Sequence, residues 1–150
     1  EIKDIKQQAP KKLQKTSNKI SFENNAVTSE IISTIKTKKN IIQIDSLGRI
    51  AQVTLLGHQY KDENGTNIKL FDENQLRPLE VRYSNRALNE EAFKTKVIAS
   101  SKNLDATVNV AKLVLTQKMS NAITTKILTI YPDGHYNIDI SVTNNEPFFI

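Results

Sequence analysis

The sequence lacks several residue types and patterns on which common activities depend. It has no cysteine, only two histidines and four glycines, and no run of about 18 apolar residues that would span a membrane as a helix. Its first residues also lack the apolar stretch of a signal peptide. The absence of cysteine excludes disulfide bonds, thiolate zinc sites and cysteine nucleophiles, but it leaves the redox compartment open. The glycines are scattered, which excludes a glycine-rich phosphate loop.

The two histidines, His58 and His135, do not form a catalytic pattern. A serine triad needs a histidine within hydrogen-bond reach of the nucleophile. Neither histidine lies in a nucleophile elbow or a helical metal-binding pair. The loop at 62–66 alternates acids and amides, but its glycine is misplaced for a calcium loop and the closing glutamate is absent. We therefore expect no enzyme activity, no cofactor and no metal site.

The charge of the chain is concentrated at its beginning. Residues 1–40 hold nine lysines against four acidic residues, whereas residues 41–150 hold twelve basic and twelve acidic residues. A nucleic-acid-binding domain usually carries its basic residues on a folded face, with aromatic groups among them. Because the neutral part of this chain is the part that is patterned to fold, we expect no nucleic-acid partner.

Residues 1–28 are rich in lysine, glutamine, asparagine and serine, and fit neither the helix period nor the strand period. We interpret them as a flexible, lysine-rich tether. The chain starts with Glu1 instead of methionine, so we expect it to be a piece of a longer protein. The tether is either a plain solvated linker or a membrane-proximal segment that lies near anionic lipid, where each basic residue adds up to about 1 kcal/mol. The lysines concerned are Lys11, Lys12, Lys15 and Lys19.

Short β-branched segments separated by turn signals begin at Ile31. Eighteen isoleucines and thirteen threonines favour strands over helices. The connections between most segments are short, which favours antiparallel pairing, because parallel crossovers need about a dozen residues. We predict that residues 29–150 form one mainly β domain, an antiparallel β-sandwich with one short helix. The predicted strands are 31–37, 41–46, 49–56, 66–71, 79–83, 96–100, 107–117, 123–131 and 135–143.

Two local patterns are more specific. The sequence Tyr131-Pro-Asp-Gly134 predicts a tight turn, since proline presets φ and glycine can take a left-handed conformation. After it, apolar and polar residues alternate up to Val142, as in a strand with one buried face. The segment from Ser84 to Phe93 predicts one or two helical turns, capped by Ser84 or Asn85 and burying Leu88 and Ala92.

Two further features allow alternative interpretations. Asn64-Gly65-Thr66 is an N-x-S/T sequon with Asp62 before it, and it predicts either a glycosylation acceptor at Asn64 or a plain polar hairpin tip. The chain ends in three apolar residues, Phe148, Phe149 and Ile150. This end predicts either that the fold continues beyond Ile150, so that the domain is truncated here, or that these residues pack inward as a last strand.

Two segments together carry a family resemblance. The first is IIQIDSLGRIAQVTLL at 41–56, followed by NIKL at 67–70 and PLEV at 78–81; the second is KILTIYPDGHYNIDISVTN at 126–144. They resemble the periplasmic domain of bacterial YidC membrane-protein insertases, and the lysine-rich front is similar to the tether that follows that family's first transmembrane helix. The resemblance implies a β-supersandwich similar to galactose mutarotases, with a cleft on one face. It also implies a location on the periplasmic side of the inner membrane, where transmembrane segments outside this chain hold the domain.

The leading hypothesis from this resemblance is a non-catalytic domain that assists insertion and folding of inner-membrane proteins. It would dock nascent membrane proteins, or the Sec translocon and its accessory subunits. The alternatives are a carbohydrate- or lipid-binding module and a mutarotase-like sugar epimerase, for which no acid and base can be named. Polar residues that face either solvent or a cleft are the candidate partner- or ligand-binding residues: Arg82, His135, Asn137 and Asp139.

Overall fold

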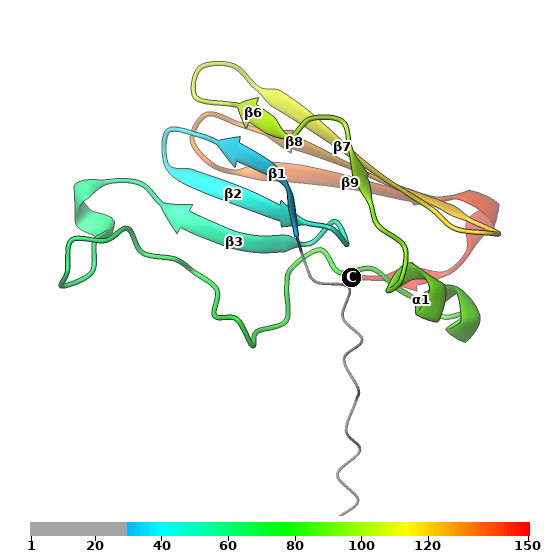
Figure 1. The fold of residues 1–150 in the computed structure, drawn as a ribbon. Helices are drawn as coiled ribbons and strands as arrows, with labels where there is room; N and C mark the ends of the chain where they lie inside the picture. The colour runs from blue at the N-terminus through cyan, green and yellow to red at the C-terminus, as the bar shows by residue number, and fades with distance from the viewer. Residues whose placement is uncertain (1–29) are drawn as a thin grey trace, which may run out of the picture.

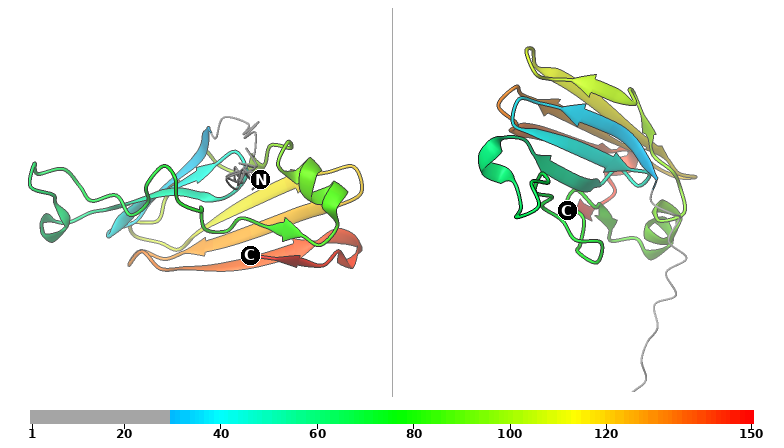
Figure 2. Two further views of the ribbon diagram at one scale, coloured as in Figure 1. Left: turned by 90° about the horizontal axis from the view of Figure 1, so that it is seen from below. Right: turned by 60° about the vertical axis from the view of Figure 1, so that its left-hand side comes forward.

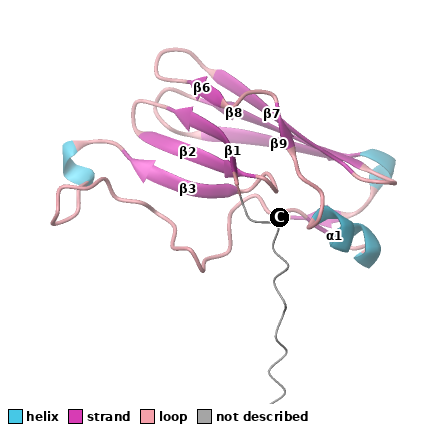
Figure 3. Ribbon diagram, in the orientation of Figure 1, coloured by secondary structure: helices cyan, strands magenta, loops and turns pink. Residues whose placement is uncertain are grey.

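Two four-stranded sheets face each other in the computed structural model, which describes residues 30–150 (Figure 1). The first sheet has the strand order β3-β2-β1-β6, with β1 at Ile31–Lys36, β2 at Asn40–Asp45, β3 at Ile50–Leu55 and β6 at Asn103–Asp105. The second has the order β5-β7-β8-β9, with β5 at Ile98–Ala99, β7 at Ala111–Lys118, β8 at Ile123–Ile130 and β9 at Tyr136–Val142. Strands dominate the described chain (Figure 3), so the predicted mainly β sandwich is confirmed.

The main core lies between these two sheets. Alternating residues of β1 and β2 point inward and meet the inward residues of β7 and β8, as the strand period requires. The fully buried side chains of this core include Ile35, Ile42, Ile44, Leu113, Leu115, Leu128 and Ile130. Each stabilises the fold by roughly 1.5–3 kcal/mol relative to an exposed position. The sandwich is therefore held mainly by branched aliphatic residues.

The hairpin of β8 and β9 forms as its sequence predicts. The Tyr131 amide donates to the His135 carbonyl, and the Gly134 amide donates to the Tyr131 carbonyl, which closes the turn. Gly134 has φ of 96°, in the region that favours glycine. The Asn40 side chain donates to the Gly134 carbonyl at 3.3 Å, so the turn is attached to the neighbouring sheet.

A second, smaller core lies at one end of the sandwich beneath helix α1, Arg86–Ala92. The Asn85 side chain accepts a hydrogen bond from the Leu88 amide, and Leu88 and Ala92 are buried, so the predicted helix and its cap are confirmed. This helix packs over a two-stranded sheet formed by β4, Arg82–Tyr83, and β10, Phe148–Phe149. The apolar end therefore forms a strand, in which Phe148 is half-buried and Phe149 is exposed.

Two predictions about pairing differ from the structure. Residues 66–71 do not form a strand, although their backbone touches β3 through an isolated bridge between Thr54 and Lys69. The apolar residues of this segment remain partly exposed, with Ile68 at 38% and Leu70 at 48%, so burial does not stabilise a regular strand there. In addition, β1 and β6 pair in parallel, because β6 returns to the first sheet only after the long excursion that follows β3.

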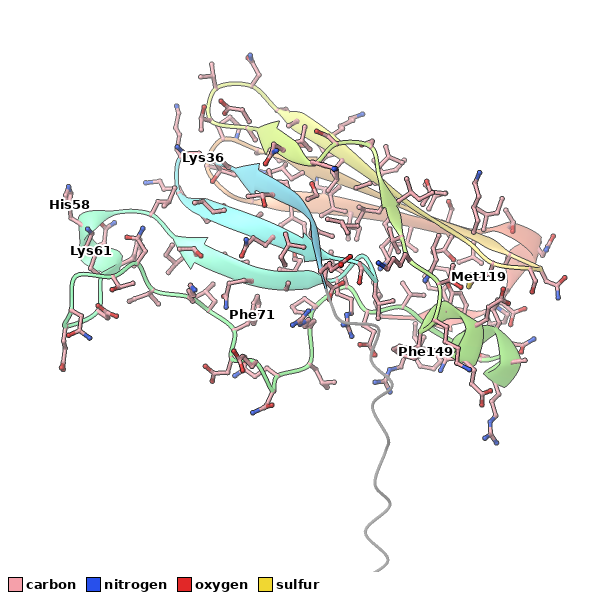
Figure 4. All side chains as sticks on the ribbon, in the orientation of Figure 1. Lys36, His58, Lys61, Phe71, Met119 and Phe149 are labelled. Atoms are coloured by element: carbon pink, nitrogen blue, oxygen red, sulfur yellow. The ribbon has the colours of Figure 1, made fainter. Side chains whose placement is uncertain are left out.

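The long connection between β3 and β4 lies along the outside of the sandwich. Its first part contains the 3₁₀ turn η1, His58–Tyr60, and projects beyond the strand ends (Figure 2). His58 and Lys61 lie at this projecting end, far from Met119 and Phe149 near α1 (Figure 4). A second 3₁₀ turn, η2 at Thr143–Asn145, joins β9 to β10. Within residues 30–150, no helix has the length and hydropathy to cross a membrane.

Candidate functional site

Three of the four candidate binding residues lie on one exposed face at the start of β9, with His135 just before the strand. The side chains of His135, Asn137 and Asp139 are exposed, while the intervening Tyr136 and Ile138 are half-buried against the core. The His135 ring stacks on Tyr131 with 4.1 Å between ring centroids, and its Nδ1 contacts the carboxylate of Asp133. These contacts fix His135 at the turn. The face is therefore open to solvent, and it borders neither of the two hollows described below.

Arg82, the fourth candidate, lies elsewhere. It belongs to β4, and its Nε donates to the Glu80 carboxylate at 2.9 Å. The neighbouring Tyr83 packs in the small core with Val142, at the end of β9 farthest from His135. Seven residues of strand separate these ends by roughly 20 Å. The structure thus does not bring Arg82 together with the β9 residues into one site.

The most concentrated polar chemistry is a cluster of which sequence reasoning selected only Arg82. We call it the ionic cluster, and it consists of Asp45, Arg49, Arg77, Glu80, Arg82 and Lys126. Asp45 is fully buried at its centre and accepts hydrogen bonds from Arg49 Nε at 2.9 Å and Arg77 Nη1 at 2.8 Å. Its other oxygen accepts from the backbone amides of Leu47 and Arg49. A buried carboxylate with this many donors is compensated.

Lys126 enters the ionic cluster from β8. It occupies an inward position of that strand, is 4% exposed, and donates to the carbonyls of Gly48 at 2.8 Å and Leu79 at 2.6 Å. Burial lowers the pKa of Lys126 to about 8, while the charge of Asp45 opposes this shift. The pKa is lowered because the buried cation loses its hydration. The two carbonyls and the nearby carboxylates compensate for only part of that loss.

The ionic cluster fastens one short segment onto the sandwich. Four consecutive residues are each held: Arg77 by Asp45, the Pro78 carbonyl by the Ile50 amide, the Leu79 carbonyl by Lys126, and Glu80 by Arg49. The backbone of Leu79 has φ of 67°, which is unfavourable for a leucine. A cavity of about 20 Å³ beside Lys126 has room for about one water molecule. The arrangement therefore resembles a structural fastening more than a substrate site.

A second hollow, a groove of about 260 Å³, lies beside α1. Its walls come from α1 and its cap, the turn at 120–122 between β7 and β8, and Asn144 and Glu146. The Glu91 carboxylate accepts from the amide and hydroxyl of Ser120, both at 2.7 Å, which holds that turn against the helix. Ala87, Leu88 and Ala122 line this groove beside asparagine and glutamate residues, so the groove is mixed in polarity.

The remaining predicted positions are Asn64 and the lysines of the tether. Asn64 is exposed in a turn where the Asp62 carboxylate accepts from the amides of Asn64 and Thr66. This geometry leaves the sequon accessible, and glycosylation stays a prediction. The membrane-proximal lysines, Lys11, Lys12, Lys15 and Lys19, and the tether boundary at 28 lie outside the described residues. No group of three or more histidine or acidic side chains is placed to hold a metal in the part of the chain that the structure describes.

Sequence comparison gives similar proteins of one kind. The chain is 38% identical over 122 residues to the membrane protein insertase YidC of Campylobacter jejuni, which covers 80% of this chain and 23% of that protein. It is 37% identical over 123 residues to YidC of Wolinella succinogenes, covering 81% of this chain and 23% of the relative. For YidC of Helicobacter pylori the identity is 33% over 132 residues, covering 74% of this chain and 24% of the relative. The chain spans about a quarter of the length of these curated relatives. No family model and no solved structure matches it.

Proposed function

Because this chain is homologous to the YidC membrane protein insertases over about four fifths of its length, we propose that it serves membrane-protein insertion as a docking domain. In this role it binds nascent membrane proteins or subunits of the Sec translocon on the periplasmic side of the inner membrane. Lysines of the tether, such as Lys12, lie near anionic lipid in this proposal. The single observation that carries the proposal is the 38% identity to an insertase across 122 residues.

The described surface supports docking more than catalysis. The charged groups of the ionic cluster are bonded to one another or to backbone carbonyls, so they are committed to holding residues 77–80. A sugar epimerase needs a general acid and a general base that face each other across a substrate. By contrast, the exposed face of β9 presents polar groups to solvent, and the groove beside α1 presents both polar and apolar groups. We therefore propose a non-catalytic domain with weak interfaces, for which tethering at the membrane raises the local concentration.

The proposal is tested by removing the domain from the intact insertase. Residues 30–150 are excised in a bacterium that carries this protein, and the insertion rate of a model inner-membrane protein is measured by protease protection. Slower insertion, together with loss of Sec subunits that copurify with the intact insertase, is the expected result. A control carries Asn74→Asp, which changes an exposed residue of the connection between β3 and β4, outside both the β9 face and the groove beside α1. Unchanged insertion and unchanged copurification after excision would remove the docking role.

A further inference from the structure

The connection between β3 and β4 contains a loop, residues 61–67, whose backbone bonds are local. An isolated bridge joins the two ends of the loop. Inside it, the Asp62 amide donates to the Thr66 carbonyl and the Gly65 amide donates to the Asp62 carbonyl, both at 2.9 Å. The loop lies where the connection projects beyond the strand ends, at the position of Lys61 in Figure 4. It can therefore open without breaking a hydrogen bond of either four-stranded sheet.

This loop contains the sequon Asn64-Gly65-Thr66, with Asp62 two residues before the asparagine. Because three-residue sequons also arise by chance, the position in the fold decides whether one can be used. Asn64 and Thr66 are both exposed, and a Cβ added at Gly65 would meet no atom of the described chain within 4 Å. An N-linked glycan is bulky and needs a surface position of this kind.

The Asp62 carboxylate shapes the sequon. One of its oxygens accepts hydrogen bonds from the amides of Asn64 at 2.9 Å and Thr66 at 2.8 Å, as in an Asx turn. Asp62 is itself exposed, so its acidic group lies on the surface next to the asparagine. The acid, the amide and the hydroxyl therefore share one short turn, where one enzyme can contact all three.

We propose that Asn64 is an N-glycosylation site, modified by an oligosaccharyltransferase that recognises Asp62 as well as Thr66. The donor is an oligosaccharide linked to a polyprenyl pyrophosphate. A bond forms between Asn64 Nδ2 and C1 of the first sugar, while the bond from C1 to the pyrophosphate oxygen breaks. The pyrophosphate leaves with the electron pair of that bond, and a base of the transferase takes one proton from the amide nitrogen. The site rests on the periplasmic location in the proposed function, since lipid-linked oligosaccharides are transferred on that side of the membrane.

A glycan at this loop is compatible with the proposed docking role. Lys61 and Met119 lie at opposite ends of the domain in Figure 4, and Met119 is next to the turn that lines the groove beside α1. The glycan therefore leaves that groove free.

The same connection offers a matched site that lacks one feature. Residues 72–74 repeat the Asp-Glu-Asn of residues 62–64 and are also exposed, but Leu76 stands where the loop has Thr66. Asn74 is expected to stay unmodified, because leucine has no hydroxyl. Leu76→Thr completes this second sequon at a side chain that is 81% exposed, so the variant should gain a glycan at Asn74.

The test uses the intact membrane protein, produced in a bacterium together with an acid-requiring oligosaccharyltransferase and its lipid-linked oligosaccharide. Trypsin digestion of the denatured protein places Asn64 and Asn74 on separate peptides, residues 62–69 and 70–82. Mass spectrometry is expected to find the glycan on the first peptide and none on the second. Asn64→Gln and Thr66→Val should lose the glycan completely, whereas Thr66→Ser keeps the hydroxyl and should keep the glycan.

Asp62→Asn separates the two roles of this residue. An asparagine side chain still accepts hydrogen bonds from the amides of residues 64 and 66, so the turn is kept while the acid is removed. Glycan occupancy at Asn64 is expected to fall below that of the unmodified protein. Equal occupancy would overturn the recognition of Asp62.

The remaining outcomes separate the site from the location. If Leu76→Thr gains a glycan at Asn74 while Asn64 carries none, the transferase reaches this connection and rejects the native loop, which would overturn the site. If neither asparagine is modified, a Gln75→Cys variant is treated with a membrane-impermeant maleimide and compared with the unmodified protein. Labelling from the periplasm would overturn glycosylation alone, whereas no labelling would overturn the periplasmic location as well.

Discussion

The buried Lys126 predicts an unusual rise of stability at alkaline pH. Burial lowers its folded-state pKa to about 8 from 10.5. Below pH 8 both the folded and unfolded states hold the proton, so this group adds no pH dependence. Between pH 8 and 10.5 the unfolded state binds more protons, so the free energy of unfolding increases with pH. With these values the increase from pH 7 to pH 9.5 is about 2 kcal/mol. The neutral amine still has two N–H donors for the carbonyls of Gly48 and Leu79.

The assay is urea unfolding followed by far-UV circular dichroism at pH 7, 8.5 and 9.5, with Lys126→Met as the comparison. Methionine has a similar length but no titrating group, so the variant is expected to lose the rise. The range stops below pH 10, because burial also raises the pKa of Tyr83. Above about pH 10 this tyrosine ionises first in the unfolded state, so its ionisation lowers the free energy of unfolding. An unmodified chain whose stability falls steadily over this range, or a Lys126→Met variant with the same rise, would refute the reasoning.

Three further predictions concern stability, each measured by the urea midpoint at pH 7. Asp45→Asn leaves the Arg49 and Arg77 cations without their buried carboxylate and should cost about 3 kcal/mol; a loss below about 1 kcal/mol would contradict this. Asn85→Ala removes the α1 cap and should cost about 1 kcal/mol, whereas an unchanged midpoint would show that the cap is dispensable. Gly134→Ala should cost about 1 kcal/mol more than Gly65→Ala: both glycines have positive φ, but the new Cβ would lie 2.9 Å from Asn40 Nδ2 only at 134. Equal losses would remove that contact as a cause.

Local patterns predict the long strands and the helix, because each depends on neighbouring residues. The turn before His135 and the Asn85 cap are examples, since proline, glycine and a capping amide act within a few positions. These patterns do not predict β6, and β4 and β5 are shorter than predicted. Residues 66–71 fail the same reasoning. Their alternation is that of a strand, but the sheet edge they touch leaves Leu70 exposed, and burial is a tertiary property.

The ionic cluster shows why polar sites are harder to predict. Asp45, Glu80 and Lys126 are separated by dozens of residues, and only the fold brings them together. One signal was present in the sequence: Lys126 lies between Thr124 and Leu128 at the inward positions of an alternating strand. A lysine at such a position predicts a buried cation that needs partners. The identity of those partners depends on long-range packing, which the local pattern does not contain.

The docking role is tested most directly by photo-crosslinking in the intact membrane protein. Probes are placed singly at Arg82, His135 and Asp139 on the folded surface and at Lys12 in the tether, and the products are identified by mass spectrometry. Capture of a Sec subunit or a nascent membrane protein at the folded-domain positions is the predicted result, and the capturing position identifies the docking face. Capture of lipid at Lys12, with no protein captured at the folded positions, would contradict the docking role and leave the domain as a spacer.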